Sequence, residues 1–353
     1  METSKVKRIH DFGQSIWLDF IDRDIIKSGR LKDLIENDGV RGVTSNPAIF
    51  EKAISSSSDY DSDILRIAEQ TQDFEDVFYQ LAISDIQQAA DIFKPLYNQE
   101  DVRGADGYVS LEVSPRLAMD TEGTFQQAVD LWKKVARQNV MIKIPGTEPG
   151  LEAIRRAIAE GININVTLLF GLDRYRAVAE AYIAGLEERL EKDQPIAEIA
   201  SVASFFLSRI DVMVDPQLDE KGLGELKGDV AIASAKKAYE IYQEVFSSER
   251  WKKLEAEGAK PQRLLWASTS SKNPAFKATK YVDALIGKNT VDTIPMETLE
   301  AYRTEGEPAD RLTDDLDQAT EILEKLKSVG INLDEITQKL EDEGVEKFIA
   351  PYD

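Results

Sequence analysis

Short apolar runs rich in β-branched residues alternate along the chain with longer segments whose apolar residues recur at helical spacing. Such alternation is typical of strand–helix units whose strands form a parallel sheet. The pattern predicts eight strands, at Ile16–Phe20, Gly42–Ser45, Tyr108–Val113, Met141–Pro145, Asn163–Leu169, Ser201–Phe206, Arg263–Thr269 and Asp292–Met296. Eight strands in this order favour an α/β protein with the (β/α)8 fold, the TIM barrel.

The segments between the predicted strands are expected to be helices, and three stretches add to the plain barrel pattern. Phe74–Phe93 predicts an additional helix between strands 2 and 3, and Asp314–Phe348 predicts two helices at the C-terminus. Pro216–Asp229, which is rich in glycine and charge, predicts a loop after the sixth strand. No linker, repeat or low-complexity segment divides the chain, so we expect one barrel domain over residues 1–353.

Several predicted strands carry a polar residue between apolar neighbours, although a buried parallel strand is usually apolar throughout. Lys143 lies between Ile142 and Ile144, so alternation turns the isoleucines to the outer helices and the lysine into the barrel. A lone lysine of this kind is more often solvated at a strand end. The same alternation, however, turns further polar side chains inward: Asp19, Glu112, Asn165, Thr167 and Ser204. Buried polar groups on five strands are costly unless they contact each other or a ligand, which indicates an active site.

These residues support imine chemistry. Burial disfavours a charged ammonium, and a neutral Lys143 amine can attack a ketone to form an imine. The protonated imine withdraws electrons from the neighbouring carbon–carbon bond, which can then break. Glu112 suits the proton transfers through water that dehydrate the carbinolamine, and Asp19 suits removal of the substrate hydroxyl proton during cleavage. Carboxylates alone can bind magnesium, but a strand lysine would compete for the same space, so we expect neither metal nor cofactor.

Composition narrows the choice of chemistry and partners. The 353 residues include no cysteine and a single histidine, His10, which excludes thiol nucleophiles, cysteine-bound zinc and a histidine-based triad. The net charge of -22 argues against a nucleic-acid partner. No apolar run approaches the ~20 residues of a membrane helix, and the N-terminal stretch lacks the apolar core of a signal peptide. We therefore expect a cytoplasmic protein with no membrane partner.

Five segments, taken together and in this order, resemble transaldolase from about Ile16 to Lys272. They are Gly42-Val-Thr-Ser-Asn-Pro47, Ser110-Leu-Glu-Val113, Met141-Ile-Lys-Ile-Pro-Gly-Thr147, Ile164-Asn-Val-Thr-Leu-Leu-Phe170 and Ser204-Phe-Phe-Leu-Ser-Arg209. The resemblance implies a class I aldolase-type barrel of the pentose phosphate pathway. Its reaction moves a dihydroxyacetone unit from sedoheptulose 7-phosphate to glyceraldehyde 3-phosphate, giving erythrose 4-phosphate and fructose 6-phosphate.

The resemblance also implies roles for matching residues. Lys143 matches the lysine that forms the Schiff base, and Asp19 matches the acid/base of bond cleavage. Glu112 and Thr167 match the pair that holds the catalytic water. The residues that hydrogen-bond the sugar match Asn46, Asn165 and Ser204.

The phosphate site departs from the commoner family pattern. Arg209 matches a phosphate-binding arginine. Many transaldolases have Ala-Ser-Phe-Arg after the seventh strand, whereas this chain has Trp266-Ala-Ser-Thr-Ser-Ser-Lys272. Ser268 therefore matches, the second arginine is absent, and Lys272, two positions later, is the candidate replacement. The alternative for Lys272 is an exposed loop lysine. The departure indicates a variant subgroup.

Two other functions compete with the transferase. A lyase similar to fructose 6-phosphate aldolase would keep the Schiff base but release dihydroxyacetone, although those relatives have much shorter chains. A non-catalytic barrel that binds sugar phosphates would not need Asp19 and Glu112 together. Sugar phosphates are the expected substrates in the first two cases. The sequence favours neither a monomer nor a homodimer.

Overall fold

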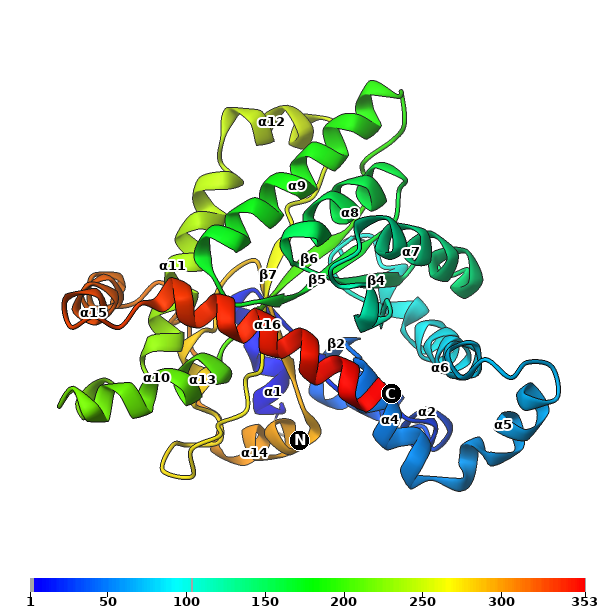
Figure 1. The fold of residues 1–353 in the computed structure, drawn as a ribbon, viewed down its shortest axis with the longest axis horizontal. Coiled ribbons are helices and arrows are strands. Elements are labelled where there is room, and N and C mark those ends of the chain that lie inside the picture. Colours follow the sequence, from blue (N-terminus) through cyan, green and yellow to red (C-terminus); the bar gives the residue numbers. More distant parts are fainter. Residues whose placement is uncertain (1–2, 103, 353) are drawn as a thin grey trace.

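A computed structural model describes residues 3–102 and 104–352 of the chain. Its eight strands are all parallel and close a barrel in sequence order (Figure 1). They are β1 (Gln14–Leu18), β2 (Val40–Val43), β3 (Tyr108–Glu112), β4 (Val140–Pro145), β5 (Ile164–Leu169), β6 (Ser201–Phe206), β7 (Arg263–Ala267) and β8 (Thr290–Ile294). The predicted (β/α)8 barrel is confirmed.

Three strands, including the two that close the barrel, lie slightly earlier in the chain than predicted. β1, β2 and β8 each begin and end two residues before the expected bounds, so that Asp19 directly follows β1. The extended backbone nevertheless continues past the strand end, because the Asp19 N–H donates to the Ile294 carbonyl at 2.9 Å. The Asp19 side chain is thereby held at the C-terminal mouth of the barrel.

Helices cover the outside of the barrel. The N-terminal part contains α1 (Lys5–Arg8), the 3-10 helix η1 (Ile9–Phe12), α2 (Arg23–Lys27), α3 (Arg30–Asp33) and the π-helix η2 (Leu34–Asp38). The outer ring contains the short η4 (Pro115–Leu117), α7 (Thr121–Val135), α8 (Glu148–Ala159), α9 (Leu172–Glu191), α10 (Ser208–Glu220), α11 (Val230–Val245), α12 (Glu249–Ala256), α13 (Lys280–Ala284) and α14 (Met296–Glu305).

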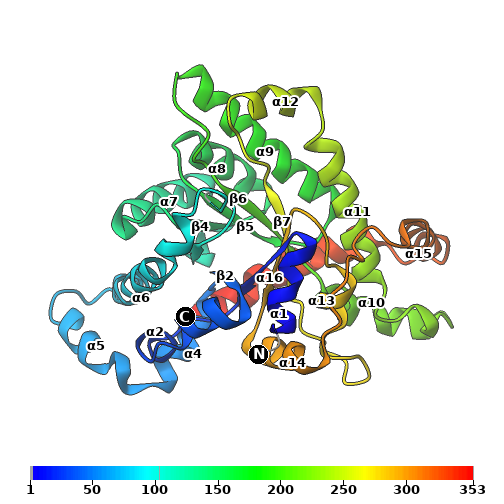
Figure 2. The same ribbon diagram turned by 180° about the vertical axis from the view of Figure 1, so that it is seen from behind.

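The additional helices expected between strands 2 and 3 and at the C-terminus are both present. The first insertion comprises α4 (Pro47–Ser56), η3 (Ser58–Tyr60), α5 (Asp61–Ala68) and the long α6 (Phe74–Tyr97). The C-terminal pair is α15 (Leu316–Ser328) and α16 (Leu333–Tyr352). α16 crosses one end of the barrel, in front of the strands in Figure 1, whereas α1 lies at the opposite end, nearest the viewer in Figure 2.

The prediction of a loop over Pro216–Asp229 is wrong for the first part of this segment. α10 continues through Pro216 to Glu220, and η5 (Gly224–Leu226) follows before α11. A proline inside a helix removes one backbone hydrogen bond. Val214 and Leu218 on either side are fully buried, so burial of this apolar face outweighs the local cost.

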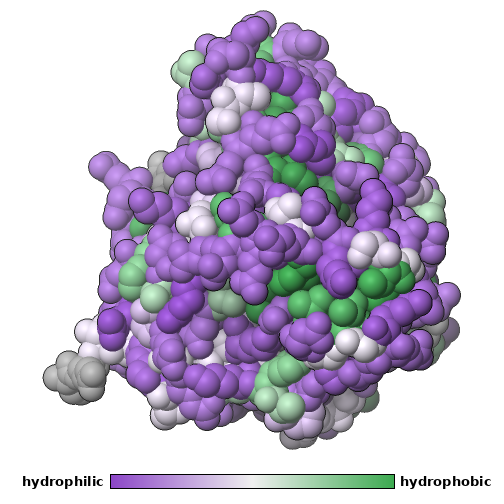
Figure 3. All heavy atoms as spheres, turned by 90° about the vertical axis from the view of Figure 1, so that its left-hand side faces the viewer, coloured by the Kyte–Doolittle hydropathy of each residue, from purple (hydrophilic) through white to green (hydrophobic). Residues whose placement is uncertain are grey.

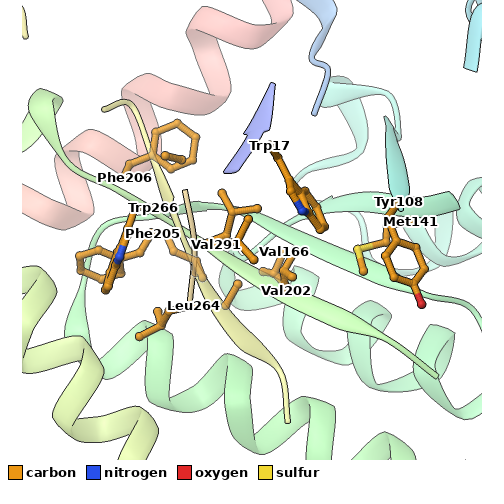
Figure 4. Close-up of a cluster of buried hydrophobic side chains, with 14 of the residues drawn as sticks. Trp17, Tyr108, Met141, Val166, Val202, Phe205, Phe206, Leu264, Trp266 and Val291 are labelled. Carbon is orange, nitrogen blue, oxygen red and sulfur yellow. The ribbon is translucent and has the colours of Figure 1, made fainter. Parts of the chain in front are cut away.

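Apolar side chains fill the barrel below its C-terminal mouth. Figure 4 shows buried residues of this core, among them Trp17, Tyr108, Met141, Val202 and Val291. Gly42 on β2 makes room for the Trp17 ring, because a Cβ there would lie 2.6 Å from it. The mouth of the barrel is thus left to the polar residues that end the strands.

The molecular surface is mostly hydrophilic on the face seen in Figure 3, with smaller apolar areas between polar ones. Within the described residues, no helix combines the length and the apolar character that crossing a membrane requires.

Candidate active site

Lys143 and Glu112 lie opposite each other on neighbouring strands. The register of β3 and β4 pairs them directly, and both are buried. Lys143 Nζ lies 3.5 Å from Glu112 Oε2 and donates a hydrogen bond to the Ser45 carbonyl at 3.1 Å. The predicted inward orientation of both side chains is therefore observed, and the amine lies within reach of a carboxyl group.

The Glu112 carboxyl group has an unusual environment. Burial raises its pKa from 4.5 to about 7, and the positive charge of Lys143 opposes that rise. Neither oxygen has a hydrogen-bond partner among the described residues, since 3.5 Å is an ion-pair distance and too long for a good N–H···O bond. A carboxyl group with this pKa can both donate and accept a proton near neutral pH.

Thr167 is the second predicted water-binding residue. It is fully buried on β5, where the register pairs it with Pro145, two residues after Lys143. Its hydroxyl also lacks a hydrogen-bond partner among residues 3–102 and 104–352. Unpaired buried polar atoms are costly in a folded protein, so these groups are suited to a water molecule or a substrate.

Asp19 is held by a hydroxyl chain that the sequence analysis did not identify. Thr44 Oγ1 donates to Asp19 Oδ1 at 2.6 Å, and the same Thr44 oxygen lies 2.6 Å from Thr293 Oγ1. Burial raises the pKa of Asp19, while the nearby Lys143 charge and the Thr44 hydrogen bond lower it. Although half-buried as a whole residue, Asp19 has its carboxyl group largely surrounded by protein.

Three predicted sugar-binding residues lie close to Lys143. Asn165 is the register partner of Lys143 on β5. Its side chain accepts a hydrogen bond from Ser204 Oγ at 2.7 Å and donates one to Ser110 Oγ at 3.1 Å. Asn46 caps α4 by accepting the Ile49 N–H at 2.9 Å. These bonds fix the orientation of each amide.

A cavity of about 210 Å³ opens at the C-terminal mouth of the barrel. Seven of the predicted site residues line it: Asp19, Asn46, Lys143, Ser204, Arg209, Ser268 and Lys272. Its wall does not include Glu112, Asn165 or Thr167, which are buried on the strands beside that of Lys143. The structure thus gathers the ten predicted residues around one end of the barrel, seven in the cavity wall and three buried beside it.

Arg209 and Lys272 bring positive charge to the same cavity. Arg209, in the first turn of α10, is half-buried, and its Cζ lies 5.5 Å from the Phe206 ring centroid. It makes no hydrogen bond or ion pair with any described residue. Lys272 is exposed in the loop between β7 and α13 and donates to Ser270 Oγ at 2.8 Å. Arg209 and Lys272 therefore face one cavity, and neither forms an ion pair with a carboxylate of the part of the chain that the structure describes.

Two residues at strand ends near the cavity have a left-handed backbone. Ser268, which follows β7, has φ of 54°, and Leu168 on β5 has φ of 58°. The register of β5 with β6 is irregular at Leu168. Ser268 Oγ lies 2.8 Å from Ser208 Oγ, which ties the end of β7 to the start of α10. Such backbone strain in non-glycine residues is concentrated at functional sites.

Several residues of the cavity wall were not predicted from the sequence: Thr44, Phe206, Thr269, Ser270, Thr293, Glu297 and Phe348. Thr44 and Phe206 lie within the segments that carry the family resemblance, so the sequence contained a pattern that could have identified them. Phe348 comes from α16, and no local pattern connects it with the strands. Among the described residues, no three His, Asp or Glu side chains form a cluster able to hold a metal ion.

Comparison with known proteins matches the chain to one family and to relatives of nearly the same length. Residues 16–353 match the family described as Transaldolase/Fructose-6-phosphate aldolase. A protein named Transaldolase from Trichodesmium erythraeum (strain IMS101) is 47% identical over 100% of this chain and 96% of its own length. Proteins of the same name from Saccharopolyspora erythraea and Thermobifida fusca are 48% and 45% identical, over 98% and 99% of this chain and 94% and 96% of their own lengths. The similarity extends through the barrel and the C-terminal helices.

Proposed function

The chain belongs to the transaldolase/fructose-6-phosphate aldolase family, and from this premise we propose that it acts as a transaldolase. It moves a dihydroxyacetone unit from sedoheptulose 7-phosphate to glyceraldehyde 3-phosphate, in the pentose phosphate pathway. The observation that carries the proposal is the buried Lys143 amine with the Glu112 carboxyl group 3.5 Å away.

The reaction begins with an imine. The Lys143 amine attacks the ketone carbon of the donor, and the resulting carbinolamine must lose water. Glu112 and Thr167 place a water molecule for these proton transfers, and Glu112 supplies the proton that leaves with the hydroxyl group. A pKa of about 7 keeps much of this carboxyl group protonated at neutral pH, as dehydration requires.

Asp19 then assists carbon–carbon cleavage. It takes the proton of the hydroxyl group on the departing carbon of the breaking bond, which becomes the aldehyde carbonyl, while the bonding electrons move toward the protonated imine to give an enamine. Erythrose 4-phosphate leaves as the aldehyde. The enamine attacks the aldehyde carbon of glyceraldehyde 3-phosphate, Asp19 returns the proton to the new hydroxyl group, and hydrolysis of the imine releases fructose 6-phosphate.

The remaining predicted residues hold the substrate. Asn46, Asn165 and Ser204 hydrogen-bond the hydroxyl groups of the three-carbon unit. Arg209 and Lys272 bind the phosphate at the far end of the cavity, where charge-assisted hydrogen bonds are the strongest available. Ser268, which lines the same cavity, binds the substrate beside them.

A lyase reaction is not favoured. It would protonate the enamine and release dihydroxyacetone, whereas the relatives of nearly full length are named Transaldolase. Product analysis with and without an acceptor aldehyde separates the two reactions. We place the enzyme in the cytoplasm, because anionic sugar phosphates do not cross a bilayer unaided and must be used where they are made.

Borohydride trapping tests the proposed function. Reduction in the presence of fructose 6-phosphate should leave a three-carbon adduct on Lys143, detected by mass spectrometry of peptides. Lys143→Arg keeps the positive charge but cannot form the imine, so adduct and activity should both vanish. An adduct on another lysine, or an active Lys143→Arg enzyme, would defeat the assignment.

A further inference from the structure

Three side chains form a hydrogen-bonded chain that ends on Asp19. Thr44 Oγ1 donates to Asp19 Oδ1 at 2.6 Å, and Thr293 Oγ1 lies 2.6 Å from Thr44 Oγ1. A hydroxyl group has only one proton to donate. Since Thr44 uses its proton on Asp19, the short contact with Thr293 can be a hydrogen bond only if Thr293 is the donor.

We propose that Thr293 is a positioning residue, which donates to Thr44 and thereby holds Asp19 as a proton acceptor with Oδ1 occupied and Oδ2 left for the substrate hydroxyl. The inference rests on the proposed function, because it refines the role of Asp19 in carbon–carbon cleavage. Thr293 acts through Thr44 and needs no contact with the reacting atoms.

The position of Thr293 on β8 is itself well fixed. The side chain is buried, and the Thr293 carbonyl accepts a hydrogen bond from Thr269 Oγ1 at 3.0 Å. A β-branched side chain on a strand has few allowed rotamers, so its hydroxyl is held towards Thr44. Thr290, three residues earlier, donates instead to the Gly287 carbonyl at 2.6 Å and does not line the cavity.

The hydrogen bonds among these three side chains run in one preferred direction, from Thr293 through Thr44 to Asp19. With Asp19 ionised, both hydroxyl protons point towards the carboxylate and both are used. A proton placed on Oδ1 would force Thr44 to donate back to Thr293, whose own proton has no other acceptor among the described residues. The substrate proton is therefore accepted at Oδ2. Consecutive hydrogen bonds also polarise one another, which strengthens the bond from Thr44 to Asp19.

Other charges act on Asp19 and must stay constant in a test. Lys143 and Arg209 favour the ionised carboxylate, and Glu297 on α14 opposes it. Asp19 in turn interacts with Glu112 on β3. A substitution at Thr293 changes none of these groups, so a shift between variants reports on the hydroxyl chain.

The decisive comparison uses Thr293→Val, Thr293→Ser and, as a control, Thr290→Val. Valine keeps the shape of threonine but removes the donor. Thr293→Val should form the imine with fructose 6-phosphate at the wild-type rate, yet cleave it more slowly. The acidic limb of its kcat–pH profile should move up by as much as roughly 0.7 pH unit, the scale of losing the cooperative part of a charge-assisted hydrogen bond. Thr293→Ser should restore both properties.

The outcomes separate this inference from the proposed function. Thr290→Val should lower thermal stability, because it removes the bond to Gly287, and should leave the pH profile unchanged. A Thr293→Val enzyme with the wild-type profile and cleavage rate overturns the inference alone, as does an equal shift in Thr290→Val or a failed rescue by serine. If the wild-type enzyme gives no Lys143 adduct, the proposed function fails and this inference fails with it.

Discussion

Glu112 and Lys143 are register partners on β3 and β4, and Lys143 Nζ lies 3.5 Å from Glu112 Oε2. This separation allows electrostatic attraction without a short hydrogen bond that would hold the Lys143 proton. Both Glu112 oxygens lack a hydrogen-bond partner among the described residues. The carboxyl group is therefore free to exchange protons with a water molecule while the amine reacts.

Glu112→Gln tests the proton transfers of imine formation. The Glu112 pKa is raised from 4.5 to about 7, so its acid form is present below that pH and is lost as the pH rises through it. Imine formation in the wild type should fall over this range. General acid–base groups contribute roughly 10²–10⁴-fold, and glutamine should slow imine formation by that factor and remove the transition. Single-turnover borohydride trapping from about pH 5 to 9 measures both. A glutamine variant that keeps the transition would refute the role.

Asp19→Asn tests the cleavage step. Asparagine keeps the size of the side chain but cannot accept the substrate proton, so the variant should form the imine and accumulate it uncleaved. The expected loss in kcat is again about 10²–10⁴-fold. Mass spectrometry of the trapped adduct distinguishes the full sugar from the three-carbon unit. Asp11→Asn, at an exposed carboxylate, is the control and should behave as wild type. An Asp19→Asn adduct containing only three carbons would contradict this role.

The fold and the central residues of the site follow from strand alternation. Lys143 between two isoleucines, and Glu112 between Leu111 and Val113, could be turned inward on sequence alone because side chains alternate along a strand. The ends of the strands do not follow from local pattern alone. Asp19 lies beyond β1 because the strand pairs with β8 over Gln14–Leu18, a register that depends on barrel closure and not on local pattern.

Residues that join distant parts of the chain could not be predicted. Thr293 meets Thr44 only because β8 closes the barrel beside β1, and the two residues are 249 positions apart. Phe348 reaches the cavity because α16 packs across the barrel mouth. Pro216 marked a break in helical propensity, but the burial of Leu218 maintained the helix. In each case a long-range contact decided the outcome.

Phe348→Ala tests the contribution of α16 to the site. Phe348 is 5% exposed and lines the cavity. Truncation of a buried phenylalanine costs about 3–5 kcal/mol of stability, and here it would also widen the cavity and admit water. We expect a lower Tm and a higher KM for fructose 6-phosphate. Val345→Ala on the same helix, which packs on the core without lining the cavity, should lower Tm without raising KM. Equal changes in KM would mean that α16 acts only through stability.

The phosphate region depends on two elements that are tied together. Tyr281 on α13 donates its hydroxyl proton to Asp211 on α10, with the oxygens 2.6 Å apart. α10 carries Arg209, and the loop that leads to α13 carries Lys272. The hydrogen bond therefore connects the segments of both cations and limits how far they can separate.

Arg209→Ala should lower kcat/KM for phosphorylated substrates more than Lys272→Ala does. Arginine can bind a phosphate through two parallel hydrogen bonds, whereas lysine acts as a point charge, and Lys272 is exposed while Arg209 is half-buried. A charge-assisted hydrogen bond is worth about 1.5–3 kcal/mol, or roughly 10- to 150-fold in kcat/KM if it persists to the transition state.

The measurement is kcat/KM for fructose 6-phosphate and for fructose in each variant. Lys277→Ala, which removes an exposed lysine paired with Glu307, controls for the change in net charge. Equal losses on both sugars would mean that Arg209 supports the fold and does not bind phosphate. If Arg209→Ala is impaired and Lys272→Ala behaves as wild type, the second phosphate-binding cation lies elsewhere. A second cation is still required, because a net charge of -22 repels the substrate and local positive charge must hold it.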